Sequence, residues 1–395
     1  MTFWEQYWHV IAFYTLVAIT IYLNRNKFEF EAKFIGLLRT NTGVEWMNKH
    51  GKKYAHIYKP LSHIGIYVGF IGMIIILGYL FYGAYQLVAV PNAAPVVSPV
   101  LPGAAIPGTG ITIPLIAGLL ALFIVVAVHE AGHGVVSAAH NIPVKHSGVG
   151  FFGPIPVAFV EPNEEKISKA PDKTQLRIFA AGPWVNVLQA ILAIGLFIAI
   201  GAALTPLTST QGIQFSQIQE NSPAAQAGLD ANTPYTTING EEITSPQHFL
   251  SYFSNASPHD QILLDDKRIT LGENQEEKAC IGVVGIQAAL TEEDFRKATP
   301  LLARGIQFIQ ETIYWVFVLA LGLGLANLLP LGPVDGGRMI HLPLVAWLGK
   351  TKGEAVWAWT AKILLGLLLI LLLVPIIKAV AGPSTAQALS TCFTV

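Results

Sequence analysis

Charged residues are scarce in this sequence. Lysine, arginine, aspartate and glutamate together make up 12% of the 395 residues, whereas hydrophobic residues make up 52%. A soluble domain normally carries about twice that share of charge. The composition therefore argues against an ordinary soluble protein and predicts an integral membrane protein in contact with the lipid bilayer. The net charge of −1 gives no support for a nucleic-acid partner.

Cysteine is nearly absent, with Cys280 and Cys392 as the only two. This count excludes a disulfide-rich scaffold and a zinc site built from cysteines. The N-terminus also lacks a basic region followed by a small-residue cleavage site, so no cleavable signal peptide is predicted.

The sequence is rich in long apolar runs. The loops at 24–63 and 141–175 carry most of the lysines between these runs, so the positive-inside rule predicts that both are cytoplasmic and that the N-terminus is outside. A proline- and glycine-rich stretch, 89–110, is then an external connection. Six membrane spans are predicted, at 7–23, 64–88, 111–128, 179–204, 313–329 and 359–377.

The end of the third run carries the sequence HEAGH. His129 and His133 are four residues apart, so on a helix both imidazoles lie on one face and can bind one ion, with Glu130 beside them. Two neutral imidazoles suit Zn²⁺, and a neighbouring carboxylate can take a proton from water whose pKa the metal has lowered. Two buried histidines satisfied by hydrogen bonds would leave Glu130 unexplained. We therefore favour a metal site toward the cytoplasmic end of this helix.

Two polar residues in later spans are candidates for the same site. The fifth run descends to the cytoplasmic face and is followed by PVDGGR, so Asp335 is level with the two histidines and is the natural third zinc ligand. Its alternative role is that of a turn or cap residue. In AGPWVN, Asn186 is an amide within an apolar run, which either bonds a neighbouring helix or faces the site.

The stretch GVGFFGPIPVAFVEP is apolar, broken by glycine and proline, and too short to cross a membrane. Non-helical backbone at membrane depth is tolerated only against protein or a water-filled cavity. We interpret it as a re-entrant β-like loop beside the site, whose exposed edge could pair with an extended substrate. An ordinary interfacial loop is the alternative. The residues that we expect to contact substrate are Gly148, Gly150, Phe151 and Pro156 in this loop, and Asn327 ahead of the aspartate motif.

From about 205 to 303 the chain is soluble in character, and acidic residues far outnumber basic ones. Strands are predicted at 213–218, 261–271 and 281–287, with a helix at 246–253, a short helix starting at Ser222 and a hairpin turn at Asn239-Gly240. The strings NSPAAQAGL and INGEEI resemble the PDZ family. That resemblance implies a small peptide-binding or gating module, which the topology puts outside.

Taken together, HEAGH, AGPWVN and PVDGGR resemble the site-2 protease family of intramembrane zinc metalloproteases. The resemblance implies that His129, His133 and Asp335 bind zinc and that Glu130 activates water. It also implies that Asn186 positions substrate or stabilises the oxyanion, and that the loop at 148–160 is a re-entrant hairpin.

The expected fold is a mainly α-helical polytopic membrane protein of about six transmembrane helices with a small α/β PDZ-like extracytoplasmic domain. The expected function is zinc-dependent hydrolysis of peptide bonds within transmembrane segments of membrane proteins. The alternative is a membrane adaptor with a structural metal, for which His146 or His140 would have to supply a fourth ligand. A transporter and another type of membrane HExxH protease find less support. The domains are predicted at 1–110 (accessory), 111–204 and 305–382 (catalytic core), and 211–288 (PDZ-like).

Overall fold

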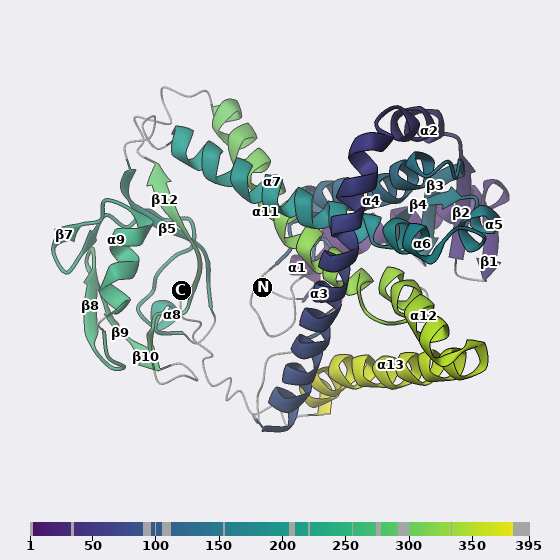
Figure 1. The fold of residues 1–395 in the computed structure, drawn as a ribbon. Coiled ribbons are helices and arrows are strands. Elements are labelled where there is room, and N and C mark those ends of the chain that lie inside the picture. The colour runs from purple at the N-terminus through teal and green to yellow at the C-terminus, as the bar shows by residue number, and fades with distance from the viewer. Residues whose placement is uncertain are drawn as a thin grey trace. The chain divides into compact units, whose positions relative to one another are not determined.

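The computed structural model divides into two units, which are described separately. It describes residues 3–32, 35–89, 96–98, 100–104, 112–152, 155–204, 210–219, 222–254, 256–273, 278–290, 300–332 and 334–381. The first unit, called here the helical unit, comprises residues 1–108, 112–197 and 311–376. The second, called the α/β unit, comprises residues 109–111, 198–310 and 377–395 (Figure 1).

Five helices in the described part of the chain are long and apolar enough to cross a membrane. The sixth predicted span is α1 (Phe3–Leu23), whose apolar portion, Trp8–Leu23, is shorter than the others, so the count of six is not confirmed. Large apolar side chains on these helices are exposed, for example Ile74 (70%) and Trp359 (65%), as expected for surfaces in contact with lipid. The five helices are α3 (Ala55–Ala89), α4 (Leu115–Ala139), α7 (Ala181–Leu204), α11 (Pro300–Asn327) and α13 (Lys350–Ala381).

The predicted polar loop at 24–63 is instead largely ordered structure. It contains two strands, β1 (Glu29–Ala32) and β2 (Ile35–Thr40), and the helix α2 (Val44–Lys53). The predicted re-entrant loop folds as a hairpin of β3 (Val144–Phe152) and β4 (Ile155–Pro162). All four strands form one antiparallel sheet in the order β1-β2-β3-β4.

Three short helices complete the helical unit: α5 (Glu164–Ser168), α6 (Asp172–Phe179) and α12 (Asp335–Leu348). A buried cluster that includes Met73, Val136, Ile178 and Met339 joins α3, α4, α6 and α12. This apolar contact fixes the first residue of α12 relative to the end of α4, although the two are about 200 positions apart in sequence.

The α/β unit has one hydrophobic core around Phe215, Ile238, Phe249, Leu264 and Ile269. Its helices begin where the sequence predicts, because the side chains of two serines, at 222 and 245, cap α8 (Pro223–Gln226) and α9 (Pro246–Ser251). Its strands are β5 (Thr210–Ile218), β6 (Thr237–Ile238), β7 (Glu241–Glu242), β8 (Gln261–Leu264), β9 (Lys267–Thr270), β10 (Gly272–Glu273), β11 (Ala279–Cys280) and β12 (Val283–Leu290).

The turns of this unit test two sequence predictions. Asn239 and Gly240 both have positive φ (51° and 87°) and connect β6 to β7, which confirms the hairpin turn. The single strand predicted at 261–271 is wrong, because Asp265 also has a positive φ of 50° and the segment folds back as the β8–β9 hairpin. Cys280 is disulfide-bonded, while the other cysteine, at 392, lies outside the described residues.

Candidate active site

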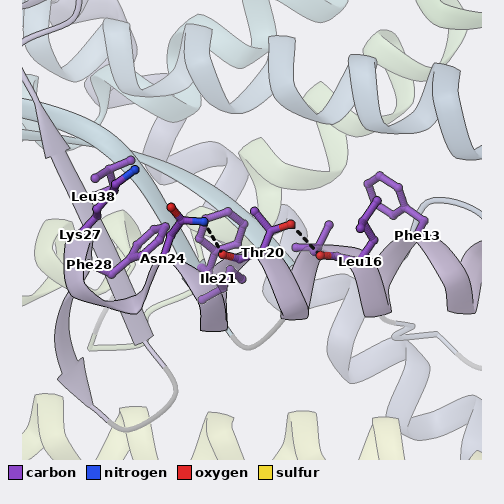
Figure 2. Close-up of a pocket in the computed structure, with 10 residues that line it drawn as sticks. Phe13, Leu16, Thr20, Ile21, Asn24, Lys27, Phe28 and Leu38 are labelled. Carbon is purple, nitrogen blue, oxygen red and sulfur yellow. Dashed lines mark hydrogen bonds between the residues drawn. The ribbon is translucent and has the colours of Figure 1, made fainter.

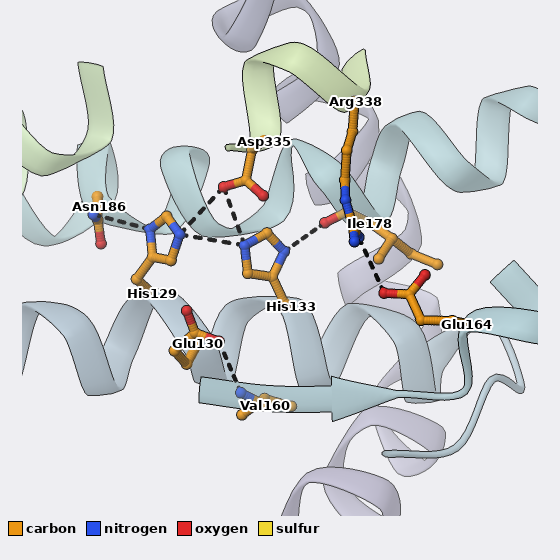
Figure 3. Close-up of polar contacts among 9 residues, drawn as sticks. All are labelled: His129, Glu130, His133, Val160, Glu164, Ile178, Asn186, Asp335 and Arg338. Carbon is orange, nitrogen blue, oxygen red and sulfur yellow. Dashed lines mark hydrogen bonds and ion pairs between the residues drawn. The ribbon is translucent and has the colours of Figure 1, made fainter. Parts of the chain in front are cut away.

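Three side chains from two distant helices converge in the helical unit. His129 and His133 lie one turn apart on α4, and Asp335 is the first residue of α12 (Figure 3). The Oδ2 atom of Asp335 is 3.2 Å from Nε2 of His129 and 3.3 Å from Nε2 of His133. The two Nε2 atoms are themselves 3.3 Å apart. The sequence prediction that Asp335 is level with the histidines thus agrees with their positions.

This triangle has the dimensions of a zinc site. Zinc binds histidine nitrogen and carboxylate oxygen at roughly 2.0–2.1 Å, and tetrahedral coordination then puts neighbouring ligand atoms about 3.3 Å apart. Oδ2 of Asp335 is buried and has no hydrogen-bond partner among the described residues. A buried carboxylate oxygen of this kind is costly unless a cation binds it. The donor set therefore fits Zn²⁺.

The outer ring nitrogens of both histidines are held by neighbouring groups. Nδ1 of His133 lies 2.8 Å from the carbonyl oxygen of Ile178, to which it can donate, and this leaves Nε2 free for a metal. Nδ1 of His129 lies 3.1 Å from the side-chain amide of Asn186, whose Oδ1 atom is buried without a partner. Because amide oxygen and nitrogen are interchangeable by a flip, Oδ1 can accept from Nδ1 of His129. Both imidazoles then present Nε2 to the metal.

Asn186 bonds a residue of a neighbouring helix and also lies at the site, so both alternatives left open by the sequence agree with its contact to His129. Its side chain is fully buried (0% exposed) and is directed at the imidazole. A contact of this kind is what residues that orient a metal-binding histidine commonly make.

The electrostatics of Asp335 favour its ligand form. Burial raises the pKa of this carboxyl group, but His133 and His129, when they carry a proton on Nε2, lower it by more, so that the pKa lies below its ordinary value; a cation held between the three groups acts in the same direction. Asp335 also lies in the first turn of α12, where the helix dipole favours a negative charge. The carboxylate is consequently ionised near neutral pH and ready to bind a cation.

Glu130 points to another side of α4 from the two histidines, toward β4 (Figure 3). Its Oε2 atom accepts a hydrogen bond of 2.9 Å from the backbone N–H of Val160. Glu130, the predicted base, is thus held by a backbone N–H of β4. The spacing of residues in HEAGH could not predict this contact.

Comparison with known proteins supports the chemistry that these residues suggest. Residues 117–371 match Peptidase family M50, the site-2 protease family. The chain belongs to this family. It is 30% identical to an uncharacterized protein of Methanocaldococcus jannaschii over 313 residues, which are 76% of this chain and 75% of that protein. It is also 24% identical to zinc metalloprotease RasP of Oceanobacillus iheyensis over 261 residues, or 53% of this chain and 60% of that protein.

Membership of family M50 and the apolar helices together make the chain a membrane metalloprotease. Zinc is the metal that the name of RasP gives. The trio of His129, His133 and Asp335 is the one group of three or more such ligands within the described residues. A catalytic zinc keeps one position open for water, whereas a structural zinc has four protein ligands.

Neither His146 nor His140, the candidate fourth ligands of a structural metal, belongs to the ligand group formed by the three residues above. His146 lies on β3 opposite Glu161, and His140 is half-buried next to Arg177 and Lys59. The adaptor alternative therefore lacks its closed metal site in the part of the chain that the structure describes.

The residues of the β3–β4 hairpin that were predicted to contact substrate lie on both of its strands. Gly148, Gly150 and Phe151 lie on β3, which pairs with β2 on one side and β4 on the other. A Cβ atom on Gly148 would lie 2.2 Å from the carbonyl oxygen of Leu38, so this glycine allows close strand pairing. Pro156 lies on β4, the last strand of the sheet, whose outer edge pairs with no strand that the structure describes.

Asn327, the remaining candidate, is the last residue of α11. One turn earlier, Gly324 packs against Asn186, since a Cβ atom there would lie 3.3 Å from Cβ of Asn186. In the described part of the chain, no polar contact joins Asn327 to the metal ligands.

Two contributions to this M50 site were missed by sequence reasoning. A Cβ atom on Gly182 would lie 2.3 Å from Nε2 of His133 and 2.5 Å from Nε2 of His129, so only glycine leaves room at this position of α7. The N-terminal segment also supports the hairpin, since the side chain of Asn48 bonds both the N–H and the carbonyl of Val144 at the start of β3. The alternation FEFE at 28–31 is a strand signal that could have located β1.

Proposed function

We propose that the chain hydrolyses peptide bonds inside the transmembrane segments of membrane proteins. The observation that carries this proposal is the position of His129, His133 and Glu130 on α4, one of the candidate membrane spans. Ionisable residues in such a helix are costly and usually functional. The substrate bond must therefore reach membrane depth to be cut.

The residues divide the chemistry between them. His129, His133 and Asp335 would hold Zn²⁺, which when bound polarises the scissile carbonyl and lowers the pKa of water. Glu130 takes the proton from the attacking water and later donates it to the leaving amine. The N–H of Val160 keeps the Glu130 carboxylate directed toward β4, and Asn186 keeps the His129 ring in its ligating orientation.

The free edge of β4 supports a way of presenting substrate. The N–H of Val160 points away from β3, and because strand backbone groups alternate, those of Ala158 point the same way. A transmembrane helix must unwind before its carbonyls can be attacked. We propose that the unwound segment pairs with β4 and is thereby carried past Glu130.

The charge distribution supports a membrane orientation. Lysines concentrate in the segments 24–63 and 141–175, so the active site is proposed to open toward the cytoplasm and the α/β unit to lie outside. Its resemblance to PDZ domains supports a role in binding a peptide ligand or in gating access of substrate. If the α/β unit excludes substrates that carry a large external domain, an earlier cut outside the membrane, as in regulated intramembrane proteolysis, would remove that domain and let the substrate enter.

The test is cleavage of a transmembrane reporter by purified full-length protein in detergent, comparing wild type with Glu130→Gln. We expect wild type to cut within the apolar segment, and the variant to lose about 10²- to 10⁴-fold in rate while keeping its zinc. Glu165→Gln is the matched control, since Glu165 is exposed and pairs only with Lys169 at the surface. Equal cleavage by wild type and Glu130→Gln would contradict the proposed base.

The same experiment separates the adaptor alternative. Wild type that holds zinc but cuts no transmembrane reporter would favour a structural metal. Cleavage confined to soluble segments would show that membrane depth does not determine where the substrate is cut.

A further inference from the structure

A groove runs along α1 in the helical unit, away from the metal ligands. It lies between one face of α1 and the sheet, and has a volume of about 510 Å³ (Figure 2). This size is within the range of roughly 300–1,000 Å³ that is usual for small-molecule sites. The lining comes from α1, from Phe28 after it, and from Leu38 on β2 and Phe151 on β3.

The lining is apolar even where its residues are polar. The Thr20 hydroxyl donates to the carbonyl oxygen of Leu16, and the Asn24 amide donates to that of Thr20 (Figure 2). The Thr20 hydroxyl and one N–H of Asn24 are therefore bonded to the backbone of α1 and do not need a polar ligand. Phe28 and Phe151 meet edge to face, with ring centroids 5.7 Å apart. The groove therefore suits a hydrocarbon occupant.

The dimensions distinguish an acyl chain from a transmembrane helix. The stretch of α1 that lines the groove, from Phe13 to its end at Leu23, is about 15 Å long at 1.5 Å per residue. This is half of the hydrocarbon core of about 30 Å, and so corresponds to one leaflet. A helix roughly 10 Å wide would occupy about 1,200 Å³ over that length, which is more than the groove holds, so a helix could only rest against its opening.

Basic residues lie at one end of the groove, directly after α1. Lys27 lines the groove itself, and no ion pair involves it within the described residues. Arg25, two residues earlier, stacks over the Tyr22 ring with its guanidinium 5.1 Å from the ring centroid. The nearest acid in sequence, Glu29, is paired with Arg39. This end of the groove therefore offers positive charge to an anion at the membrane surface.

We propose that the groove binds one acyl chain of an anionic phospholipid, with the phosphate next to Lys27. The acyl chain would lie against Leu38 and Phe151, which belong to the two strands next to β4. A bound lipid would therefore support the hairpin that carries the contact to Glu130.

The test is native mass spectrometry of the full-length protein in detergent with added phosphatidylglycerol or phosphatidylcholine. Leu16→Trp should fill the groove and abolish the phosphatidylglycerol adduct, and since Leu16 is 63% exposed the protein should still fold. Lys27→Gln should lower the preference for phosphatidylglycerol over phosphatidylcholine about five-fold, as expected for one lysine at a membrane surface. Ile19→Trp on the same helix and Lys52→Gln are matched controls that do not line the groove.

Each variant is accepted only if its zinc content and melting temperature equal those of wild type. Retention of the adduct by Leu16→Trp would overturn the assignment to this groove. Equal binding of the two lipids by wild type would overturn the role of Lys27. Displacement of the lipid by a transmembrane peptide that Leu16→Trp also fails to bind would show that the occupant is a helix instead.

Discussion

The two units of this protein both bury apolar residues but expose opposite kinds of residue. In the α/β unit the largest fully buried side chains are apolar, among them Phe215 and Phe249, while acidic residues such as Glu241 and Glu242 are exposed. In the helical unit large apolar side chains cover the outside, and His129 and Asn186 are buried. The difference reflects the two solvents, because water favours burial of apolar surface and lipid does not.

This contrast predicts what a substitution does in each unit. A truncated core residue in the α/β unit removes apolar burial and lowers the free energy of unfolding. In the helical unit, His129 and Asn186 are buried at the candidate metal site, so changes around them should alter metal binding and rate before they alter folding. The following predictions test that separation.

The largest effect is expected at Gly182, where one methyl group should disable the metal site. In Gly182→Ala the new Cβ atom would lie within 2.5 Å of Nε2 on both histidines, and so displace the ligands. A displacement of about 1 Å can cost about 10²-fold in rate, and we expect at least that loss together with loss of bound zinc. Zinc content and reporter cleavage measure both.

The control for this variant is on the same helix. A Cβ atom added to Gly195 would meet no other atom within 4 Å, so Gly195→Ala should keep zinc and activity. Alanine also has the higher helix propensity, so a loss in Gly182→Ala cannot come from a weaker α7. Full zinc occupancy in Gly182→Ala would contradict the proposed coordination.

The second prediction concerns the core of the α/β unit. Phe249→Ala removes a side chain that is 0% exposed and packs against Phe215, and should destabilise this unit by about 3–5 kcal/mol. Hydrogen exchange should show faster opening of β5 and α9, while zinc content stays unchanged. Leu263→Ala, at a side chain 39% exposed, should have a much smaller effect. Loss of zinc in Phe249→Ala would show that the two units fold as one.

The two units also differ in how far the sequence predicts them. Hydropathy and HEAGH predicted α4 and two candidate ligands on it, and the predicted membrane topology put Asp335 at the same level, which agrees with the short distances among the three side chains. The contacts of Gly182 and Val160 could not be predicted, because they depend on how α7 and β4 approach α4 in space. In the α/β unit, capping serines and Asn239-Gly240 are local signals and predicted local structure correctly.

The hairpin at Asp265 shows how a local signal can be missed. The prediction of one strand from 261 to 271 passed over the run of four charged residues from Asp265 to Arg268, and the positive φ of Asp265 marks the turn there. Its carboxylate accepts bonds from the N–H groups of Thr236 and Thr237, a distant segment, and these contacts stabilise the conformation. Tertiary contacts thus reinforce a turn that the charged run already favours.

The smallest predicted effect is a pH dependence from His140, directly after α4. Burial lowers the pKa of His140 to about 4, and Arg177 and Lys59 contribute to the same lowering. In the unfolded chain the pKa returns to about 6.5, so between these values the unfolded state binds the extra proton. The stability of the helical unit should therefore fall as pH drops from above 6.5 toward 4.

His140 is only half-buried, so solvent screening reduces this contribution to on the order of 1 kcal/mol. His140→Gln should flatten the decline of melting temperature between pH 7.5 and 5.5 in detergent, whereas His56→Gln, at an exposed position, should not. Protonation of the metal ligands contributes equally to all three proteins and cancels in the comparison. An unchanged slope in His140→Gln would mean that water reaches this histidine, and that the C-terminal end of α4 is as open to solvent as the surface of the α/β unit.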